Sequence, residues 1–396
     1  MKLFLSLAAI LFSAISFAQW TKIELGTETK LNGIHFLDEE LGYVVGEDGL
    51  FLKSLNSGIT WKPVELSYTD VLWDIDFVND TLGFIATNDG ILRTTDGAAT
   101  WIMNKENFRK AFYSICIINS TTVYASGFDG YIIKTVDSGE NWEVVHDEYE
   151  LFLLLLSITF TNSVEGYAAG MSSLGQGQNI VRTIDGGETW LPQKMGGGDV
   201  IQTIHFLDTQ TGFAGDNKGI IYKTSDKGHS WDSIFSTDNT YGIYSIQFIN
   251  SSIGYAVGGK PSTILRTSDG GNTWHKESFD DENFLTAVYF YEDKFGFALG
   301  LGGTFYKIVN NSSYTSIARE LVLQQALIYP NPVSNYLHFN ELEHGARFKV
   351  FDLSGEEVLN LGVAGKMLDI SSLKLGVYII QLETEGVIRT ERFIKK

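Results

Sequence analysis

Tryptophan recurs at a nearly constant spacing along the first three quarters of this chain. Seven tryptophans lie about 40 to 48 residues apart, namely Trp20, Trp61, Trp101, Trp142, Trp190, Trp231 and Trp274. Between them run short β-branched and aromatic stretches separated by Gly, Asn and Asp, such as Leu72–Phe77, Gly83–Asn88 and Ile91–Thr94. A period of this length with this turn chemistry predicts four-stranded antiparallel blades of an all-β propeller.

The two ends of the repeat complement each other. The seventh unit, Leu285 to Val309, lacks a last strand that begins with Trp, while Trp20-Thr21-Lys22-Ile23 precedes the first unit as an isolated copy of that strand. We predict that the N-terminal copy completes the last blade, because this leaves no unpaired sheet edge. The expected domain is a seven-bladed propeller over residues 19–311.

The fourth unit departs from the others in two ways. The segment from Ser172 to Asn179 is an insertion within its second turn. The apolar run from Leu151 to Phe160 is about half the roughly 20 residues that a membrane-spanning helix needs. We interpret this run as a loop leading into a buried strand, and we expect no transmembrane segment.

The N-terminus is typical of a secretory leader. Met1-Lys2 is followed by an apolar stretch from Leu3 to Phe17 and by Ser16-Phe17-Ala18. We therefore expect a signal peptide over residues 1–18, cleaved after Ala18. No cysteine follows that site, which argues against a lipid anchor, and Cys116 is the only cysteine, so no intrachain disulfide forms.

The turn before each repeat tryptophan has its own signature. It reads Thr183-Ile-Asp185-Gly-Gly187-Glu-Thr189-Trp190 in one unit. This resembles the Asp-box, or bacterial neuraminidase repeat, whose aspartate is expected to accept backbone N–H bonds within the turn. The structural aspartates would be Asp96, Asp137, Asp185, Asp226 and Asp269. Asn56 replaces Asp in the first unit and Ala98 replaces Gly in the second, and neither change need abolish the turn.

Whole units extend this resemblance. Segments such as GYVVGEDGLFLKS and ILRTSDGGNTW are similar to the propeller family of photosystem II assembly and stability factors, over roughly Trp20 to Val309. The Asp-box itself names no activity. A basic residue also recurs two positions ahead of the turn in every unit, and this regular placement argues for a structural role rather than the converging arginines of a sialidase.

A different pattern follows a linker at residues 312–325. From Ala326 to Lys396 polar and apolar residues alternate in short runs, which predicts a small Ig-like β-sandwich. Tyr329-Pro330-Asn331-Pro332, KVFDLSGEEV, LKLGVYIIQLETEG and a basic end resemble the type A sorting domain of the type IX secretion system of Bacteroidetes. The resemblance implies recognition by that secretion machinery and release, or attachment to the outer-membrane surface.

Charge and residue spacing exclude several functions. The net charge is −19, with 19 basic and 38 acidic residues between Gln19 and Ala318, which disfavours nucleic-acid binding. The histidines lack the spacing of metal ligands, so we expect neither a metal nor a cofactor. His35, His205 and Cys116 share one repeat position and are interpreted as side chains that fill the innermost strands. We expect a monomer.

The remaining hypothesis is a non-catalytic propeller that binds an extracellular protein or glycan. The loops after each tryptophan strand should lie opposite the Asp-box turns, and they vary in sequence. The candidate binding residues are Tyr68, Asp70, Trp73, Phe108, Arg109, Lys110, Tyr149, Tyr241 and Phe284. An extracellular glycoside hydrolase with a carboxylate pair in the central depression is the alternative. A photosystem-type assembly chaperone is disfavoured by the sorting domain.

Overall fold

The computed structural model describes residues 20–104, 110–147, 152–173, 179–195, 200–237, 241–277, 281–309, 328–329, 333–339, 347–352, 357–361, 367–384 and 387–396. The chain divides into two compact units, Met1–Asn310 and Asn311–Lys396, and each is considered by itself. The expected signal peptide and the linker at 312–325 lie outside the described residues.

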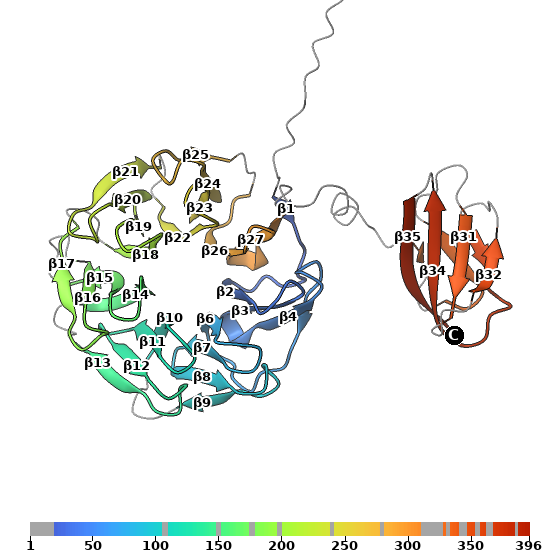
Figure 1. Ribbon diagram of the computed structural model, residues 1–396, viewed down its shortest axis with the longest axis horizontal. Helices are drawn as coiled ribbons and strands as arrows, with labels where there is room; N and C mark the ends of the chain where they lie inside the picture. The colour runs from blue at the N-terminus through green and yellow to red at the C-terminus, as the bar shows by residue number, and fades with distance from the viewer. Residues whose placement is uncertain are drawn as a thin grey trace, which may run out of the picture. The chain divides into compact units, whose positions relative to one another are not determined.

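The described part of the first unit forms seven four-stranded antiparallel sheets in a ring (Figure 1). The first three sheets are β2 (Leu31–Phe36) to β5 (Lys62–Pro63), β6 (Leu72–Phe77) to β9 (Ile102–Asn104), and β10 (Phe112–Ile117) to β13 (Glu143–His146). The second and third strands of these sheets are β3 (Leu41–Gly46) and β4 (Phe51–Leu55), β7 (Gly83–Thr87) and β8 (Gly90–Thr94), and β11 (Val123–Gly127) and β12 (Ile132–Thr135).

The next three sheets repeat this order. They are β14 (Phe152–Phe160) to β17 (Leu191–Gln193), β18 (Ile201–Phe206) to β21 (Asp232–Ser236), and β22 (Ile243–Phe248) to β25 (His275–Lys276). Their middle strands are β15 (Gly166–Ser172), β16 (Ile180–Thr183), β19 (Gly212–Asp216), β20 (Ile220–Thr224), β23 (Gly254–Gly258) and β24 (Thr263–Thr267). The all-β propeller predicted from the repeat is confirmed. The run from Leu151 to Phe160, interpreted as a loop and strand, is strand from Phe152 onward.

The seventh sheet contains both ends of the propeller. It consists of β26 (Leu285–Tyr291), β27 (Phe295–Gly300), β28 (Phe305–Val309) and the N-terminal β1 (Thr21–Lys22). Thr21 pairs with Lys307, and Lys22 pairs with Tyr306. Trp20 is buried against Phe290 of the same sheet and Tyr255 of the sixth sheet. The N-terminal strand therefore closes the ring, as the missing last strand of the seventh unit predicted.

The hydrophobic core of the propeller lies between neighbouring sheets. In one cluster Tyr43 and Phe51 of the first sheet pack on Phe77 of the second, with ring centroids 5.3–5.4 Å apart for the two pairs that include Tyr43. Trp101 meets the edge of this stack at right angles to Phe51. The repeat tryptophan thus covers the outer end of each inter-sheet core, which explains its regular spacing.

The Asp-box turns share one hydrogen-bond pattern. Asp269 accepts the hydroxyl of Thr267 and the backbone N–H of Thr273, while the Thr267 hydroxyl accepts the N–H of Gly271. The same bonds recur at Asp96, Asp137, Asp185 and Asp226. A Cβ on Gly271, at φ +72°, would lie 2.3 Å from Phe213. Ala98 adopts φ 67° at the equivalent position, so its turn persists.

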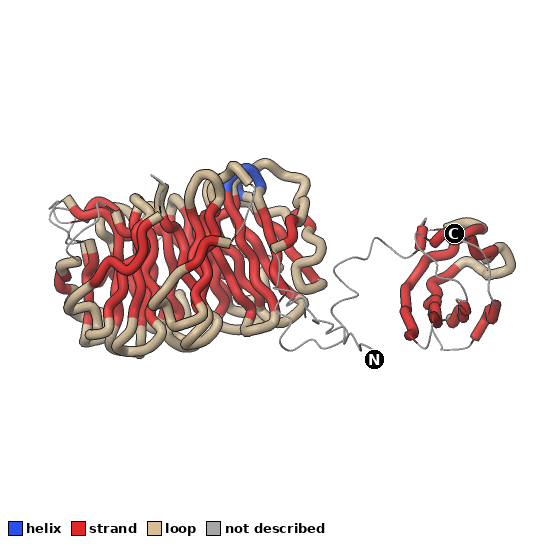
Figure 2. The backbone as a smooth tube through the Cα atoms, turned by 90° about the horizontal axis from the view of Figure 1, so that it is seen from above, coloured by secondary structure: helices blue, strands red, loops and turns tan. Residues whose placement is uncertain are grey.

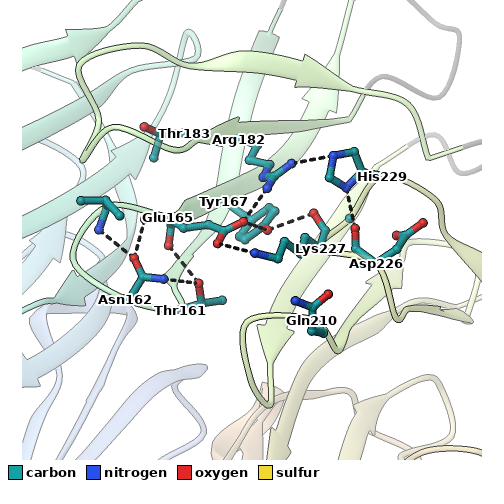
Figure 3. Close-up of polar contacts among 12 residues, drawn as sticks. Thr161, Asn162, Glu165, Tyr167, Arg182, Thr183, Gln210, Asp226, Lys227 and His229 are labelled. Atoms are coloured by element: carbon teal, nitrogen blue, oxygen red, sulfur yellow. Dashed lines mark hydrogen bonds and ion pairs between the residues drawn. The ribbon is translucent and has the colours of Figure 1, made fainter.

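Five of the seven recurring basic residues take part in contacts between neighbouring sheets. Arg93, Lys134, Lys223 and Lys307 each donate to a backbone carbonyl of the next Asp-box turn, at 2.6–3.0 Å. Arg182 instead pairs with the buried Glu165, which also accepts from Tyr167 and lies 3.8 Å from Lys227 of the next unit (Figure 3). These contacts agree with the structural role inferred from the regular spacing.

The second unit consists of two antiparallel sheets in its described part. One contains β29 (Ile328–Tyr329), β30 (Tyr336–Phe339) and β33 (Met367–Asp369). The other contains β31 (Arg347–Phe351), β32 (Glu357–Leu361), β34 (Gly376–Thr384) and β35 (Val387–Lys395). Both contribute to one core, in which Leu337 and Leu368 of the first sheet join Phe348 and Ile380 of the second. This arrangement is consistent with the expected sandwich.

Candidate binding site at the mouth of the central channel

The two faces of the ring are built from different connections. On the Asp-box face, the Asp-box turns bond to the turns between first and second strands, as in Gly97 N–H to Thr81 O. On the mouth face, the turns between second and third strands bond to the loops that enter the next sheet, as in Gly49 N–H to Asp70 O. The 3₁₀ turns η1 (Glu47–Gly49) and η2 (Leu301–Gly303) mark this face (Figure 2).

Six of the seven innermost strands have a register shift at their second residue, and the longer β14 has shifts at Leu153 and at Leu156. In β6, for example, Leu72 pairs with Thr87 and Asp74 with Ala86, so Trp73 has no partner in the ladder. A β-bulge of this kind redirects the extra side chain. The bulged residues of the seven strands are Asn32, Trp73, Tyr113, Leu156, Gln202, Tyr244 and Thr286.

These seven bulged residues line one cavity of about 800 Å³ at the centre of the mouth face. Its lining also includes Phe284 from the loop that enters the seventh sheet, Leu301 of η2, and Leu154 of β14. Cavities of this size hold small ligands or a few residues of a polypeptide. Since the bulge recurs in all seven sheets, the fold itself directs seven variable side chains into a single site.

Aromatic side chains lie on two parts of the cavity wall. Trp73 and Tyr113 meet edge to face, with ring centroids 5.2 Å apart. Phe284 meets Tyr241 at 5.2 Å and Tyr244 at 6.1 Å, also edge to face. The indole N–H of Trp73 donates to Asn88 at 2.7 Å, which fixes its orientation. Both aromatic groups are therefore held in place before any ligand arrives.

Three charged residues line the cavity. The Lys30 ammonium lies 5.0 Å from the centre of the Trp73 ring and 3.6 Å from a carboxylate oxygen of Glu47. Asp74 lies deeper and accepts the backbone N–H groups of Ile75 and Ile115, both at 2.9 Å. Burial raises the pKa of Asp74 to about 7, although these N–H donors act in the opposite direction.

Further along the innermost strands, polar side chains join neighbouring sheets. His35 lies 3.0 Å from Asp76 of the next sheet, and the Tyr289 hydroxyl accepts the Phe36 N–H. Burial lowers the pKa of His205 to about 4 and raises the pKa of the Cys116 thiol to about 12. Both side chains are thus neutral at pH 7, which is compatible with their interpretation as residues that fill the innermost strands.

The candidate residues from the sequence divide into three groups. Trp73 and Phe284 line the cavity. Four others lie in loops of the mouth face, where Tyr68 contacts Asp89, Lys110 pairs with Asp129, Asn88 donates to Asp70, and Tyr241 is 38% exposed. The remaining three, Phe108, Arg109 and Tyr149, lie outside the described residues.

Sequence reasoning missed most of the cavity. Besides Lys30, Glu47 and Asp74 it overlooked six of the seven bulged residues, because strand interiors were assigned to the core. One signal was present. When β14 is counted from Leu155, the second residue of the innermost strand varies from unit to unit, whereas the first, fourth and sixth residues are apolar in all seven units.

The described residues include no group of three or more His, Cys, Asp or Glu side chains placed to hold a metal ion. Among the same residues, no helix has the length and apolar character needed to cross a membrane.

Comparisons with known proteins agree with this architecture. Residues 327–396 match the family of secretion system C-terminal sorting domains, and residues 59–152 match the photosynthesis system II assembly factor YCF48 family. The photosystem II assembly lipoprotein Ycf48 of Picosynechococcus sp. is 26% identical over 208 residues, which cover 48% of this chain and 56% of that protein. The chain thus aligns with about half the length of this curated relative.

Solved structures of the same fold cover the propeller. YCF48 from Cyanidioschyzon merolae superimposes with a TM-score of 0.62 and 21% identity, over 74% of this chain and 99% of that one. A structure of YCF48 bound to D1 peptide gives a TM-score of 0.63 and 21% identity, over 75% and 98%. The WD40 propeller of Doa1 gives 0.61 and 11%, over 76% and 100%. At these identities the likeness shows the fold alone.

The chain therefore joins a YCF48-like β-propeller to a segment similar to secretion sorting domains. Both resemblances stated from the sequence are confirmed. A sorting domain of this kind implies secretion or a location on the outer surface of the cell.

Proposed function

We propose that this protein is an exported, non-catalytic binding module whose mouth face holds an extended segment of a partner protein. The observation that carries the proposal is the convergence of seven bulged side chains, with two fixed aromatic groups, in one open cavity of about 800 Å³. The paired strands form a rigid ring. The bulged side chains lie outside the strand ladder and line the cavity, where they can contact a ligand.

Two comparisons support this function. One similar propeller, YCF48, has been solved with a D1 peptide bound, so a ring of this architecture is compatible with a peptide ligand. The relatives with matching sequences are named as assembly factors rather than enzymes. The partner here is expected to differ from theirs, because the C-terminal segment directs this chain out of the cell.

Export is the second part of the proposal. The type IX secretion machinery recognises residues 326–396, after a leader has been cleaved behind Ala18. The binding module is then released into the medium or retained on the outer-membrane surface. The match of residues 327–396 to secretion sorting domains supports this route.

The hydrolase alternative now depends on two residues, Glu47 and Asp74, which are the carboxylates in the cavity wall. Asp74 uses both oxygens to accept backbone N–H groups, and Glu47 lies beside Lys30. A glycosidase needs one carboxyl group free to donate a proton and another free to attack or activate water. The observed partners favour a structural role for Asp74.

The test uses the full mature chain against a displayed library of random peptides and a glycan array. Peptides should be retained, and Trp73→Ala should weaken their binding about 30-fold, as expected for the loss of a binding hot spot. Ile184→Ala, on the Asp-box face and 64% exposed, is the matched control and should change nothing.

Glycan binding without peptide binding would reject the proposal. Release of reducing sugar that is lost in Asp74→Asn or Glu47→Gln would establish the hydrolase instead. Melting curves of each variant separate a lost contact from a lost fold.

A further inference from the structure

We infer that the mouth recognises an extended, net-basic polypeptide segment through two apolar anchor side chains, one on each of two opposite aromatic walls. This inference rests on the proposed function and specifies its ligand. We call Trp73 with Tyr113 the first wall. The second wall consists of Tyr244 and Phe284, together with Tyr241, which packs on Phe284 beside the cavity lining.

The two walls lie on opposite sides of the cavity. The first wall comes from the second and third sheets, and the second wall mainly from the sixth sheet and the loop entering the seventh. Around the ring, Tyr244 lies three sheets from Tyr113 in one direction and three sheets from Trp73 in the other. A single anchor side chain can therefore contact only one wall, and a ligand that uses both must cross the mouth.

The wall segments between them carry no aromatic ring among the described cavity residues. On one side lie Asn32 and Thr286, and on the other lie Leu156 and Gln202. Side chains of this kind offer hydrogen bonds and modest apolar contact to a backbone that passes over them. An extended polypeptide, with apolar side chains separated by a polar backbone, fits this alternation of surfaces.

The walls are also energetically suited to anchors. Aromatic side chains at binding surfaces contribute large apolar area at low cost in conformational entropy, and they dominate binding hot spots. Tyr241 is 38% exposed, and Leu301 beside the second wall is 39% exposed. These surfaces gain most when an apolar group of the partner covers them.

The charge of the rim selects the sign of the ligand. Glu47 lies in the cavity wall, and Asp48, Asp70 and Asp89 are exposed on the neighbouring loops of the mouth face. Lys30 is the single cationic residue among the described cavity residues, and its ammonium already lies over Trp73. The propeller segment carries twice as many acidic as basic residues, so a basic segment is attracted and an acidic one is repelled.

The experiment measures binding of a designed peptide panel to the full mature chain. Each peptide carries two Trp residues separated by one to six Gly or Ser residues, flanked by either Lys or Glu, and single-Trp peptides are included. We expect affinity to peak at one spacing, at least tenfold above the single-Trp peptides. Lys-flanked peptides should bind more tightly than Glu-flanked ones, with a difference that shrinks as salt is added.

Variants assign the anchors to the walls. Tyr113→Ala and Tyr244→Ala should each reduce the affinity of the two-Trp peptide to that of a single-Trp peptide. Each variant should still bind single-Trp peptides at the wall that it leaves intact. Tyr241→Ala changes an exposed residue, so it tests the second wall even if Tyr244→Ala fails to fold. Ile184→Ala is the control.

The outcomes separate the two proposals. If no peptide binds at the mouth, the proposed function fails. If peptides bind but spacing, second anchor and wall variants have no effect, the two-anchor inference fails while peptide binding stands. Preference for Glu-flanked peptides would overturn the assignment of a basic ligand.

Discussion

The closing strand gives the sharpest test of how the ring is held together. Trp20 is 8% exposed, packs edge to face against Tyr255 and Phe290, and donates its indole N–H to Glu277 at 2.8 Å. Replacing a buried Trp by Ala costs about 3–5 kcal/mol. A fold is typically stable by only about 5–15 kcal/mol. Trp20→Ala should therefore remove a large fraction of the stability of the propeller.

The expected shift in melting temperature follows from these magnitudes. At about 2–4 °C per kcal/mol, the lower cost of 3 kcal/mol predicts a fall of about 6–12 °C. Trp20→Phe keeps most of the packing but loses the indole donor, which costs about 1–2 kcal/mol for a partly buried bond to a carboxylate. Thr21→Ala, at an exposed residue of β1, is the control and should melt with the parent chain.

Glu277 adds a dependence on pH. Burial raises the pKa of Glu277, whereas the Trp20 indole lowers it, so removing the indole raises it further. A protein with a carboxyl group whose pKa is raised on folding loses stability as the pH rises above the pKa of that group in the unfolded state. The deficit of Trp20→Phe should therefore be larger at pH 7 than at pH 4.

Thermal unfolding and backbone amide exchange in β28 measure these effects. Accelerated exchange in β28 alone would mean that β1 detaches locally. If Trp20→Ala leaves both melting and exchange unchanged, the ring is not held by its N-terminal strand.

Three further predictions concern other parts of the chain. The pKa of Asp137 is lowered to about 2, chiefly by the Asn141 backbone and side-chain donors. The ionised carboxylate therefore stabilises the fold above pH 4, and this contribution is lost as the pH falls toward 2. Asp137→Asn should flatten that part of a profile of stability against pH. Because the pKa of the Cys116 thiol is raised to about 12, Cys116 should resist a thiol reagent at pH 8 in the folded chain and react in denaturant, and rapid labelling of the native protein would contradict the raised pKa. Deleting residues 326–396 should leave the propeller in the periplasm, and normal yield in the medium would reject the export route.

The repeat made the fold predictable because it is written in residues that the fold uses at every turn. The strand Leu72–Phe77 has the predicted bounds, and the ring closure followed from the unpaired Trp20 copy. Asp-box aspartates and box tryptophans are each tied to one position by hydrogen bonds or packing. Such positions can be recognised from a single sequence because the same residue recurs from unit to unit.

The site was less predictable, because a register shift has no residue signature of its own. Asn32, Trp73 and Leu156 occupy equivalent bulged positions, yet they share neither size nor polarity. Only the pairing of neighbouring strands shows that these residues leave the ladder. Trp73 was among the candidate binding residues, whereas its neighbour Tyr113 was assigned to the interior of a strand.

The recurring bulge also bears on how propellers of this kind diversify. A residue outside the strand ladder can be exchanged with little effect on pairing, while the residues on either side keep the sheet in register. Substitutions at these seven positions, one in each unit, would therefore change the lining of the cavity without changing the pairing of the strands. The residues that maintain the propeller and the residues that would select its ligand thus occupy different positions in the sequence. Two propellers with similar sheets could therefore bind unrelated partners.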